Sequence, residues 1–368
     1  MNSANKINVF INNSLVGSIA MTNDWLCAFQ YSKEWLETGF SISPFELPLK
    51  NDLFLAKKNP FNGNFGVFDD SLPDGWGMLI LDRYLKSINI NPNDVSILDM
   101  LTYVGSSGRG ALTFQPDNSS FSTDNADILL IESEIDNILS SDTYKGDSIE
   151  KLWKRGGSPG GARPKVFITF DNSEWLVKFP AKYDSPNIGI IEYNYSLLAK
   201  ECGINMPETK LFENRFFGVK RFDRNDNGTR IHSITAAGLL GADYRSPSLD
   251  YTQLMKLTRL LTSNEDEVWK MFRLMCFNYL INNKDDHAKN FTFLYNDTHW
   301  QLSPAYDLLP SSGFNGYHTT SFDGDILPSD KSILRIAFKS GLDEKKAKKV
   351  FSDMKETINE SNINNICE

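Results

Sequence analysis

A short polar stretch, residues 282–290, constrains the fold more than any other part of the sequence. An apolar run with helical spacing, residues 268–281, precedes it, and an alternating apolar segment, residues 291–295, follows it at once. The stretch itself combines carboxylate, imidazole, ammonium and amide side chains. A polar cluster between two buried elements indicates either a functional site or a helix end that is closed by Asx turns.

Two residues of this stretch have the spacing of a catalytic loop. Asp285 is followed, after four intervening residues, by Asn290. Protein kinases use this spacing, because the Asp accepts a hydroxyl proton and the Asn holds a metal ion. Asp and Asn are also common in ordinary loops, so the spacing alone leaves both interpretations open.

The size and charge of the chain narrow the class of protein. Its 368 residues indicate roughly two domains, and 40% hydrophobic residues with 12% aromatic residues are enough for sizeable packed cores. The net charge of −9 argues against a broad electrostatic grip on nucleic acid by this chain alone. A local basic patch or a DNA-binding partner stays compatible with that charge.

The apolar runs and the cysteines favour a cytoplasmic protein. Residues 1–20 lack a secretory signal, and the longest apolar run, residues 271–281, is interrupted by Arg273 and too short to span a bilayer. We therefore expect no membrane association. The four cysteines lack paired spacing, which fits reduced thiols and indicates neither a zinc site nor a disulfide framework: Cys27, Cys202, Cys276 and Cys367.

The N-terminal part is expected to be a small mixed α/β domain. Residues 7–11 and 15–19 alternate around an Asn turn, which predicts a hairpin. Apolar residues recur at helical spacing in residues 78–85 and 94–103, and we find no catalytic constellation in this part. Residues 117–125, which are rich in Asn, Ser, Asp and Thr, form the best candidate linker.

A glycine-rich stretch, residues 156–165, leads directly into an expected strand, residues 166–170. Its four glycines allow backbone N–H groups to turn inward and approach a phosphate closely. The alternative is a flexible linker, because the stretch is neither a Walker A sequence nor the glycine-rich pattern of kinases. We treat it as a candidate phosphate-binding loop.

Lys178 lies among apolar neighbours in the expected partner strand, residues 174–180. It either covers apolar surface with its alkyl stem or reaches the α- and β-phosphates of a nucleotide, as a strand lysine does in kinases. The second interpretation requires a carboxylate that holds the lysine. Glu192, in the first turn of a helix expected over residues 190–202, could supply it, although the helix dipole alone also favours Glu there.

The segments that follow are consistent with a kinase fold. The charges of residues 220–224 are interpreted as a solvated hairpin, and residues 230–235 as the strand that leaves the small lobe, where kinases bind adenine. Helices are expected over residues 249–261 and 266–281, at the base of a larger lobe.

A further carboxylate, Asp307, follows a short strand expected over residues 298–304. In this order, Asp285, Asn290 and Asp307 match the kinase arrangement in which hard oxygen ligands converge on Mg²⁺. A lone Asp before Leu-Leu-Pro would otherwise be an ordinary turn starter. The context therefore favours metal binding.

Several motifs in chain order carry a family resemblance. Five of them lie in the second half: residues 158–165 (SPGGARPK), 176–180 (LVKFP), 220–224 (KRFDR), 285–291 (DDHAKNF) and 302–307 (LSPAYD). Two more lie in the N-terminal part, residues 72–75 (LPDG) and 104–112. Together they resemble the HipA family of serine/threonine kinase toxins, and the similarity spans most of the chain.

The resemblance implies an α+β, two-lobed protein-kinase-like fold with a small mixed α/β N-terminal subdomain and a mainly helical C-terminal lobe. The expected segments are an N-terminal subdomain (residues 1–116), a linker and helix (117–147), a kinase small lobe with the glycine-rich loop (148–234) and a C-terminal lobe with the catalytic loop (235–368).

The activity implied by the resemblance is ATP- and Mg²⁺-dependent phosphorylation of a serine in a protein target, typically an aminoacyl-tRNA synthetase. Such phosphorylation stalls translation until an antitoxin binds. The implied partner is a helix-turn-helix antitoxin of the HipB type, which carries the DNA binding. This chain would then contact DNA only indirectly.

The family's functional residues carry over to matching positions. Asp285 would be the general base, Asn290 and Asp307 the Mg²⁺ ligands, and Lys178 the phosphate-orienting lysine. His287 is expected to act as a fixed strut of the loop rather than as a proton carrier. The nucleotide-binding positions besides Lys178 are Gly157, Ser158, Gly160, Gly161, Ala162, Arg163, Lys165, Glu192, Ser233, Ile234, His287 and Lys289.

Ser158 sits where the family has a regulatory serine that is autophosphorylated. A phosphate there would repel the phosphates of ATP, expel the loop and inactivate the enzyme. The chain departs from the family at Asp286, where members often have Gly, and the sequence assigns no role to this residue. Pro159 and Gly160 also replace the small or aliphatic residues that commonly follow the serine.

Two other functions remain open. A small-molecule kinase of the aminoglycoside phosphotransferase type shares the spacing of Asp285 and Asn290, but it would not predict the N-terminal subdomain or Ser158. A catalytically idle binding or corepressor module is less compatible with an intact set of Lys178, Asp285, Asn290 and Asp307. The target itself cannot be read from the sequence, because recognition depends on surfaces.

Overall fold

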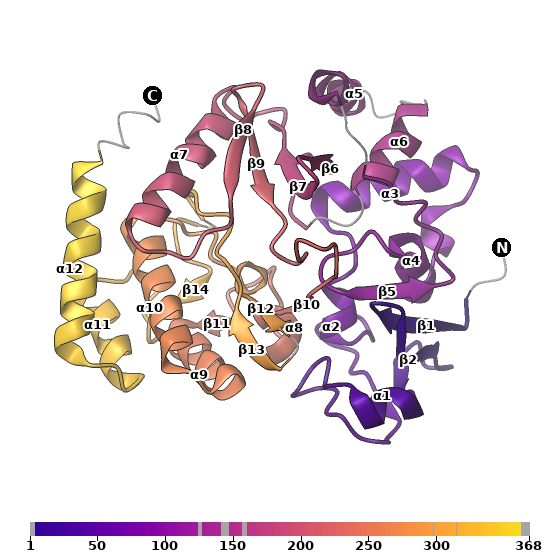
Figure 1. Cartoon of the computed structure of the whole chain (residues 1–368), viewed down its shortest axis with the longest axis horizontal. Helices are drawn as coiled ribbons and strands as arrows, with labels where there is room; N and C mark the ends of the chain where they lie inside the picture. The colour runs from indigo at the N-terminus through magenta and orange to yellow at the C-terminus, as the bar shows by residue number, and fades with distance from the viewer. Residues whose placement is uncertain are drawn as a thin grey trace. The chain divides into compact units, whose positions relative to one another are not determined.

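The chain divides into two compact units (Figure 1). Unit 1 comprises Met1–Gly189 and Lys210–Ile234, and unit 2 comprises Ile190–Thr209 and Thr235–Glu368. Within the residues that the structure describes, no helix is long and apolar enough to cross a membrane. The structure is a computed structural model, and it describes residues 4–123, 127–140, 147–156, 160–296, 298–313 and 315–361.

Unit 1 begins with a five-stranded antiparallel sheet in the order β4-β3-β2-β1-β5. The predicted N-terminal hairpin is present. Asn12 and Asn13 both adopt positive φ angles, 45° and 69°, as a two-residue type I′ turn requires. The strands are β1 (Lys6–Ile11), β2 (Ser14–Met21), β3 (Cys27–Tyr31), β4 (Phe54–Leu55) and β5 (Leu112–Gln115).

Capped helices accompany this sheet, and α4 packs against β1 and β2. A capping box between Ser96 and Asp99 fixes the start of α4, and Gly105, with a φ of 48°, ends it. The helices predicted over residues 78–85 and 94–103 correspond to α3 and α4. The helical elements are α1 (Lys33–Thr38), α2 (Gly66–Asp69), α3 (Gly75–Ser87), the 3₁₀ turn η1 (Pro92–Asp94), α4 (Ile97–Val104), α5 (Ile128–Ser140) and α6 (Asp147–Gly156).

A second, four-stranded sheet has the order β6-β7-β9-β8. Asp171 and Asn172 form the tight turn between β6 and β7, again with positive φ angles. Apolar side chains from these strands pack with those of α3, α5 and α6 in one core, which includes Trp153, Val166 and Val177. The strands are β6 (Lys165–Phe170), β7 (Ser173–Lys178), β8 (Thr209–Phe212) and β9 (Phe216–Lys220).

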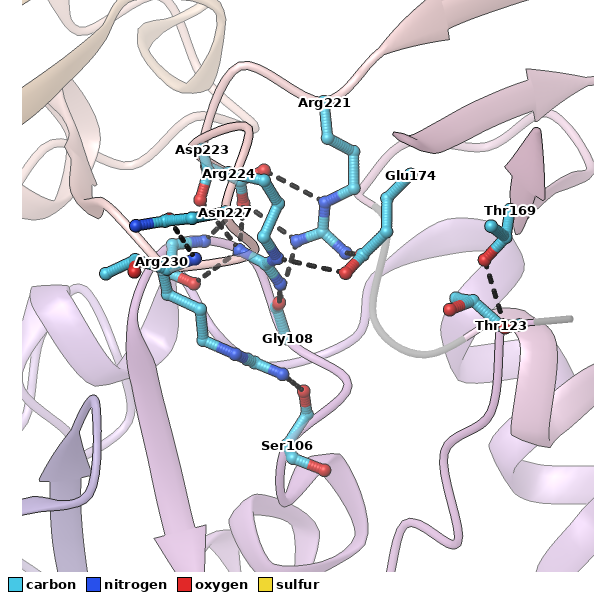
Figure 2. Close-up of polar contacts among 12 residues, drawn as sticks. Ser106, Gly108, Thr123, Thr169, Glu174, Arg221, Asp223, Arg224, Asn227 and Arg230 are labelled. Carbon is cyan, nitrogen blue, oxygen red and sulfur yellow. Dashed lines mark hydrogen bonds and ion pairs between the residues drawn. The ribbon is translucent and has the colours of Figure 1, made fainter. Parts of the chain in front are cut away.

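The interpretation of residues 220–224 as a solvated hairpin is wrong, because most of the charged side chains in this segment are buried. The side chains of Arg221, Asp223 and Arg224 are only 3%, 9% and 5% exposed. Arg221 donates to the Asp223 carboxylate over 2.9 and 2.8 Å and to Glu174 over 3.0 Å (Figure 2). The opposite charges, although buried, are therefore paired.

Arg224 and a further arginine, Arg230, bind backbone carbonyls of a loop in the N-terminal part (Figure 2). Arg224 donates to the Gly110 carbonyl over 3.0 Å, and Arg230 donates to the Ser106 carbonyl over 2.6 Å. In the other direction, the Gly110 N–H donates to Asp223 over 2.7 Å. This cluster ties the residues that follow β9 to the loop before β5 within unit 1.

Unit 2 is mainly helical. Helices α9 and α10 pack against each other and begin at the side-chain caps Asp250 and Asn264. An antiparallel hairpin, β12 and β13, follows the predicted catalytic loop. Besides α7 (Ile188–Glu201), which starts in unit 1, the helical elements are α8 (Ala236–Leu240), α9 (Tyr251–Thr262), α10 (Glu265–Leu280), η2 (Ala288–Asn290), α11 (Asp330–Lys339) and α12 (Glu344–Glu360). The strands are β10 (His232–Thr235), at the unit boundary, β11 (Leu249–Asp250), β12 (Thr292–Asn296), β13 (His299–Leu302) and β14 (Thr320–Ser321).

The prediction that Glu192 lies in the first turn of its helix is wrong, because α7 begins at Ile188. Ser185 starts the helical backbone earlier than expected: its carbonyl accepts a hydrogen bond from the Ile188 N–H over 3.0 Å. Glu192 is buried and lies one turn further along, so the dipole of the first turn does not explain it.

Candidate functional site

The loop after α10 presents two adjacent carboxylates in opposite environments. The side chain of Asp285 is exposed, whereas that of Asp286 is completely buried, at 0%. Asn290 closes this loop, because its Nδ2 donates to the backbone carbonyl of Asp285 over 2.8 Å. Of the two carboxylates, Asp285 is therefore the one that a substrate hydroxyl can reach.

Asp286 is a hydrogen-bonded anchor, a role that the sequence alone did not assign. One carboxylate oxygen accepts from the backbone N–H groups of Thr319 and Thr320, over 2.9 and 3.1 Å. The other oxygen accepts from the Tyr251 hydroxyl over 2.9 Å and lies 3.0 Å from Nδ1 of His318. Burial and the neighbouring Asp286 raise the pKa of Tyr251 well above its usual value, so the phenol keeps its proton.

The segment that carries Asp307 is bound to the same loop. Asn283 donates from Nδ2 to the backbone carbonyl of Asp307 over 3.1 Å. The Tyr306 hydroxyl donates to the Lys289 carbonyl over 2.6 Å. Asp307 itself has a φ of 54°, a left-handed conformation that is uncommon for residues other than glycine. Within unit 2, the structure thus brings together the chain segments of the predicted base and of both predicted metal ligands.

His287 and Lys289 both lie against Tyr244. The Lys289 ammonium is buried and sits 4.1 Å from the centre of the Tyr244 ring, a cation–π contact. The His287 ring centre lies 5.9 Å from the same ring. Its Nδ1 is buried and makes no hydrogen bond to the part of the chain that the structure describes. The strut role of His287 and the nucleotide contacts of both residues stay predictions.

In unit 1, two lysines face each other at the edge next to the glycine-rich stretch. Lys165 on β6 and Lys178 on β7 are directly opposed in the antiparallel register. Lys165 is buried and donates from Nζ to the Gly160 carbonyl over 2.5 Å. The Lys178 ammonium lies 5.6 Å from the centre of the Phe217 ring. The two lysines therefore lie beside each other on one face of the sheet at this edge.

The glycine-rich stretch is held by the start of α3. The Gly161 N–H donates to a carboxylate oxygen of Asp74 over 2.5 Å, and the Trp76 N–H donates to the Gly161 carbonyl over 3.1 Å. Gly161 has a φ of 97°. Asp74 belongs to the LPDG motif, but the motif alone did not predict its contact with Gly161. Ala162 is exposed; Gly157, Ser158 and Pro159 lie outside the described residues.

The remaining predicted nucleotide-binding residues differ in their burial and in their partners. Arg163 is occupied by Asp184, which it binds through Nε and Nη2 over 2.8 and 3.1 Å. Ile234 is 1% exposed, and the Ser233 hydroxyl lies where a side chain on Gly110 would have to go. The predicted pairing of Lys178 with Glu192 joins residues of different units and stays a prediction.

The fold is α+β and protein-kinase-like, as predicted. A solved structure from Shewanella oneidensis, described as a complex of HipA, HipB and operator DNA, matches this chain with a TM-score of 0.73 at 19% identity. The match covers 98% of this chain and 90% of that chain.

Family comparison then identifies the lineage. The HipA N-terminal domain model matches residues 7–115, and the HipA-like C-terminal domain model matches residues 157–361. The chain belongs to the HipA family.

Individual relatives are distant. A protein of Sinorhizobium fredii named putative kinase Y4dM is 30% identical over 155 residues, which span 37% of this chain and 37% of that protein. The serine/threonine-protein kinase toxin HipA of Shewanella oneidensis is 23% identical over 328 residues, which span 77% of this chain and 69% of that protein. The first match therefore covers well under half of that relative's length.

Proposed function

We propose that this chain is an ATP-dependent serine/threonine protein kinase that acts as the toxin of a toxin–antitoxin pair. The observation that carries the proposal is the loop in which Asp285 is exposed while Asp286 anchors the backbone and Asn290 closes it. Asp285 accepts the proton of the target hydroxyl as that oxygen attacks the γ-phosphate.

The donor set fits Mg²⁺. This ion prefers oxygen ligands and is usually held by one or two carboxylates together with nucleotide phosphates. Nδ2 of Asn290 is engaged with the Asp285 carbonyl, so Oδ1 is the atom that would bind the metal. Asp307 would supply a carboxylate oxygen. Bound there, Mg²⁺ neutralises charge on the transferred phosphate.

ATP phosphates fit the positively charged edge of unit 1. Lys165 and Lys178, which are paired across β6 and β7, would provide two cations, and the glycines beside them allow a close backbone approach. Ser158 is proposed as the site of self-inactivating autophosphorylation, on the family resemblance alone. A phosphate at that position would repel the phosphates of ATP.

The partner and the substrate are proposed from the relatives. The Shewanella oneidensis relative is named a serine/threonine-protein kinase toxin, and its solved structure contains HipB and operator DNA. We infer a cytoplasmic toxin with an antitoxin of the HipB type, which would carry the DNA contact. The proposed substrate is a serine in a protein, with an aminoacyl-tRNA synthetase as the first candidate.

Transfer of label from γ-labelled ATP tests the proposal. The full chain is incubated with Mg²⁺ and a cell extract, and labelled proteins are separated from labelled small molecules. We expect protein-bound label with the wild type and with Asp353→Asn, which alters an exposed carboxylate on α12. We expect none with Asp285→Asn. Label confined to small molecules indicates a small-molecule kinase, and absence of transfer indicates an idle binding module.

A further inference from the structure

Four buried side chains form a continuous hydrogen-bonded chain, which we call the polar chain: Asp286, Tyr251, Asn278 and Asn283. Tyr251 donates its hydroxyl proton to Asp286 over 2.9 Å, and Asn278 donates from Nδ2 to the Tyr251 oxygen over 3.0 Å. Asn283 donates from Nδ2 to Oδ1 of Asn278 over 3.0 Å. The polar chain ends at Asn283, whose Nδ2 also donates to the Asp307 carbonyl over 3.1 Å.

Every link of the polar chain is shielded from water. Asp286 and Tyr251 are 0% exposed, and Asn278 and Asn283 are 2% exposed. Hydrogen bonds in such an environment are strong, and a broken link leaves a buried polar group without a partner. Tyr251 and Asn278 come from α9 and α10, two helices that pack on each other. The polar chain is therefore held by two helices of unit 2 that pack on each other.

The two ends of the polar chain are the backbones that carry the proposed chemistry. Asp286 is the direct neighbour of Asp285, and its other oxygen is held by the N–H groups of Thr319 and Thr320. At the far end, the accepting carbonyl belongs to Asp307, whose φ of 54° persists only where the surroundings hold it. The polar chain thus connects the backbone segment of Asp285 and Asp286 with that of Asp307.

We propose that Tyr251, Asn278 and Asn283 are positioning residues, which hold the backbone of Asp307 in register with the loop that carries Asp285. The proposal rests on the proposed function of these two aspartates. All three side chains are buried, so in this proposal they contact neither substrate nor metal directly. They act through Asp286 and through the Asp307 carbonyl, so their loss misplaces a metal ligand relative to the base.

Tyr251→Phe is the sharpest test, because it removes one hydroxyl and keeps the ring that packs on Phe291 and Phe322, with ring centres 5.7 and 4.5 Å away. Its matched control is Tyr279→Phe. Tyr279 lies on α10 and donates to the Asp330 carboxylate over 2.9 Å, a similar bond that leads to neither aspartate.

Two quantities are measured for each variant. The first is the dissociation constant of Mn²⁺ in the presence of a non-hydrolysable ATP analogue, by calorimetry, and the second is kcat for phosphoryl transfer. We expect Tyr251→Phe to weaken Mn²⁺ binding and to lower kcat by about 10- to 100-fold, the range seen when partners that orient a metal ligand are removed. Tyr279→Phe should keep wild-type values of both.

A double-mutant cycle with Asn283→Ala separates positioning from general loss of stability. If the polar chain acts as one unit, Tyr251→Phe combined with Asn283→Ala loses little more Mn²⁺ affinity than the worse single variant. Thermal unfolding of each variant without ligands identifies any variant protein that fails to fold. If Tyr251→Phe fails to fold, Asn283→Ala serves as the second test of the inference.

The outcomes are distinguishable. Folded variants with wild-type kcat and Mn²⁺ affinity, but a lower melting temperature, overturn the positioning role and leave the proposed kinase function intact. A wild-type chain that binds no Mn²⁺ with the nucleotide and transfers no phosphate contradicts the proposed function, and the inference falls with it.

Discussion

Asp285 and Asp286 are adjacent in the sequence, but only Asp285 is exposed, while the carboxylate of Asp286 accepts hydrogen bonds from Tyr251, Thr319 and Thr320. This difference separates two roles that one residue could not combine. A proton acceptor has to reach the substrate, whereas an anchor has to be saturated with donors. The pair therefore predicts opposite consequences for mutation.

Asp286→Ala should destabilise the fold by about 3–5 kcal/mol, because it leaves buried donors of Tyr251, Thr319 and Thr320 without an acceptor. Asp285→Ala should cost clearly less unfolding free energy than Asp286→Ala, because Asp285 is exposed. Urea denaturation followed by circular dichroism measures both. Equal losses for the two variants would contradict the division of roles.

Burial lowers the pKa of His232 to about 4, although its hydrogen bond to the Ile42 carbonyl opposes the shift. The unfolded chain has an ordinary histidine pKa near about 6.5, so it binds a proton first as the pH falls. The neutral His232 therefore stabilises unit 1 fully above about pH 6.5, and this contribution is lost towards pH 4. The loss amounts to about 3 kcal/mol.

His232→Gln should flatten the pH dependence of the unfolding free energy between pH 6.5 and pH 4, because glutamine does not titrate. The measurement is urea denaturation at several pH values in this window. The exposed His299 offers the control, and His299→Gln should leave the slope as in the wild type. An unchanged slope for His232→Gln would show that groups other than His232 determine the pH dependence of the unfolding free energy.

Gly75→Ala should weaken nucleotide binding through the glycine-rich stretch. Gly75 has a φ of 39°, and a Cβ there would lie 2.6 Å from the Gly161 carbonyl oxygen, so the stretch has to move. Gly228→Ala is the matched control, because Gly228 also has a positive φ, 80°, but no atom lies within 4 Å of its added Cβ. Both variants carry backbone strain of about 1–2 kcal/mol.

Calorimetry with a non-hydrolysable ATP analogue distinguishes these two glycine variants. We expect a severalfold higher dissociation constant for Gly75→Ala and a wild-type constant for Gly228→Ala. Equal nucleotide affinities, with equal losses of stability, would show that the contact between Gly75 and Gly161 does not position the stretch.

Lys178→Met should reduce affinity for the same ATP analogue by about 10- to 100-fold, because a charge-assisted hydrogen bond contributes about 1.5–3 kcal/mol. Lys210→Met serves as its control. Lys210 lies on β8 in the same sheet, and its ammonium sits over the Phe170 ring at 3.8 Å. If both variants bind like the wild type, the opposed lysines do not hold the phosphates.

Local signals in the sequence were enough to predict much of the fold. Asn12 and Asn13 predicted a hairpin because few other residues tolerate two successive positive φ angles. The helical spacing of residues 266–281 predicted α10. The spacing of Asp285 and Asn290 predicted a catalytic loop, and that role stays a prediction, although a hydrogen bond joins the two residues. In each case the sequence pattern and the structure that it predicts lie within the same short segment.

Interactions between distant residues were not predictable in the same way. Arg221 and Asp223 have the composition of an exposed hairpin, and their burial depends on the Gly108 carbonyl and the Gly110 N–H, more than a hundred residues earlier in the chain. The role of Asp286 depends likewise on Tyr251 and on Thr319. Such roles follow from tertiary packing, which a single sequence does not display.

The most direct test of the central claim is a comparison of phosphoproteomes from cells that express the wild-type chain or Asp285→Asn. We predict a phosphoserine in a protein target, with an aminoacyl-tRNA synthetase as the first candidate, that appears only with the wild type. Indistinguishable phosphoproteomes, with both proteins folded and equally abundant, would contradict a kinase function based on Asp285.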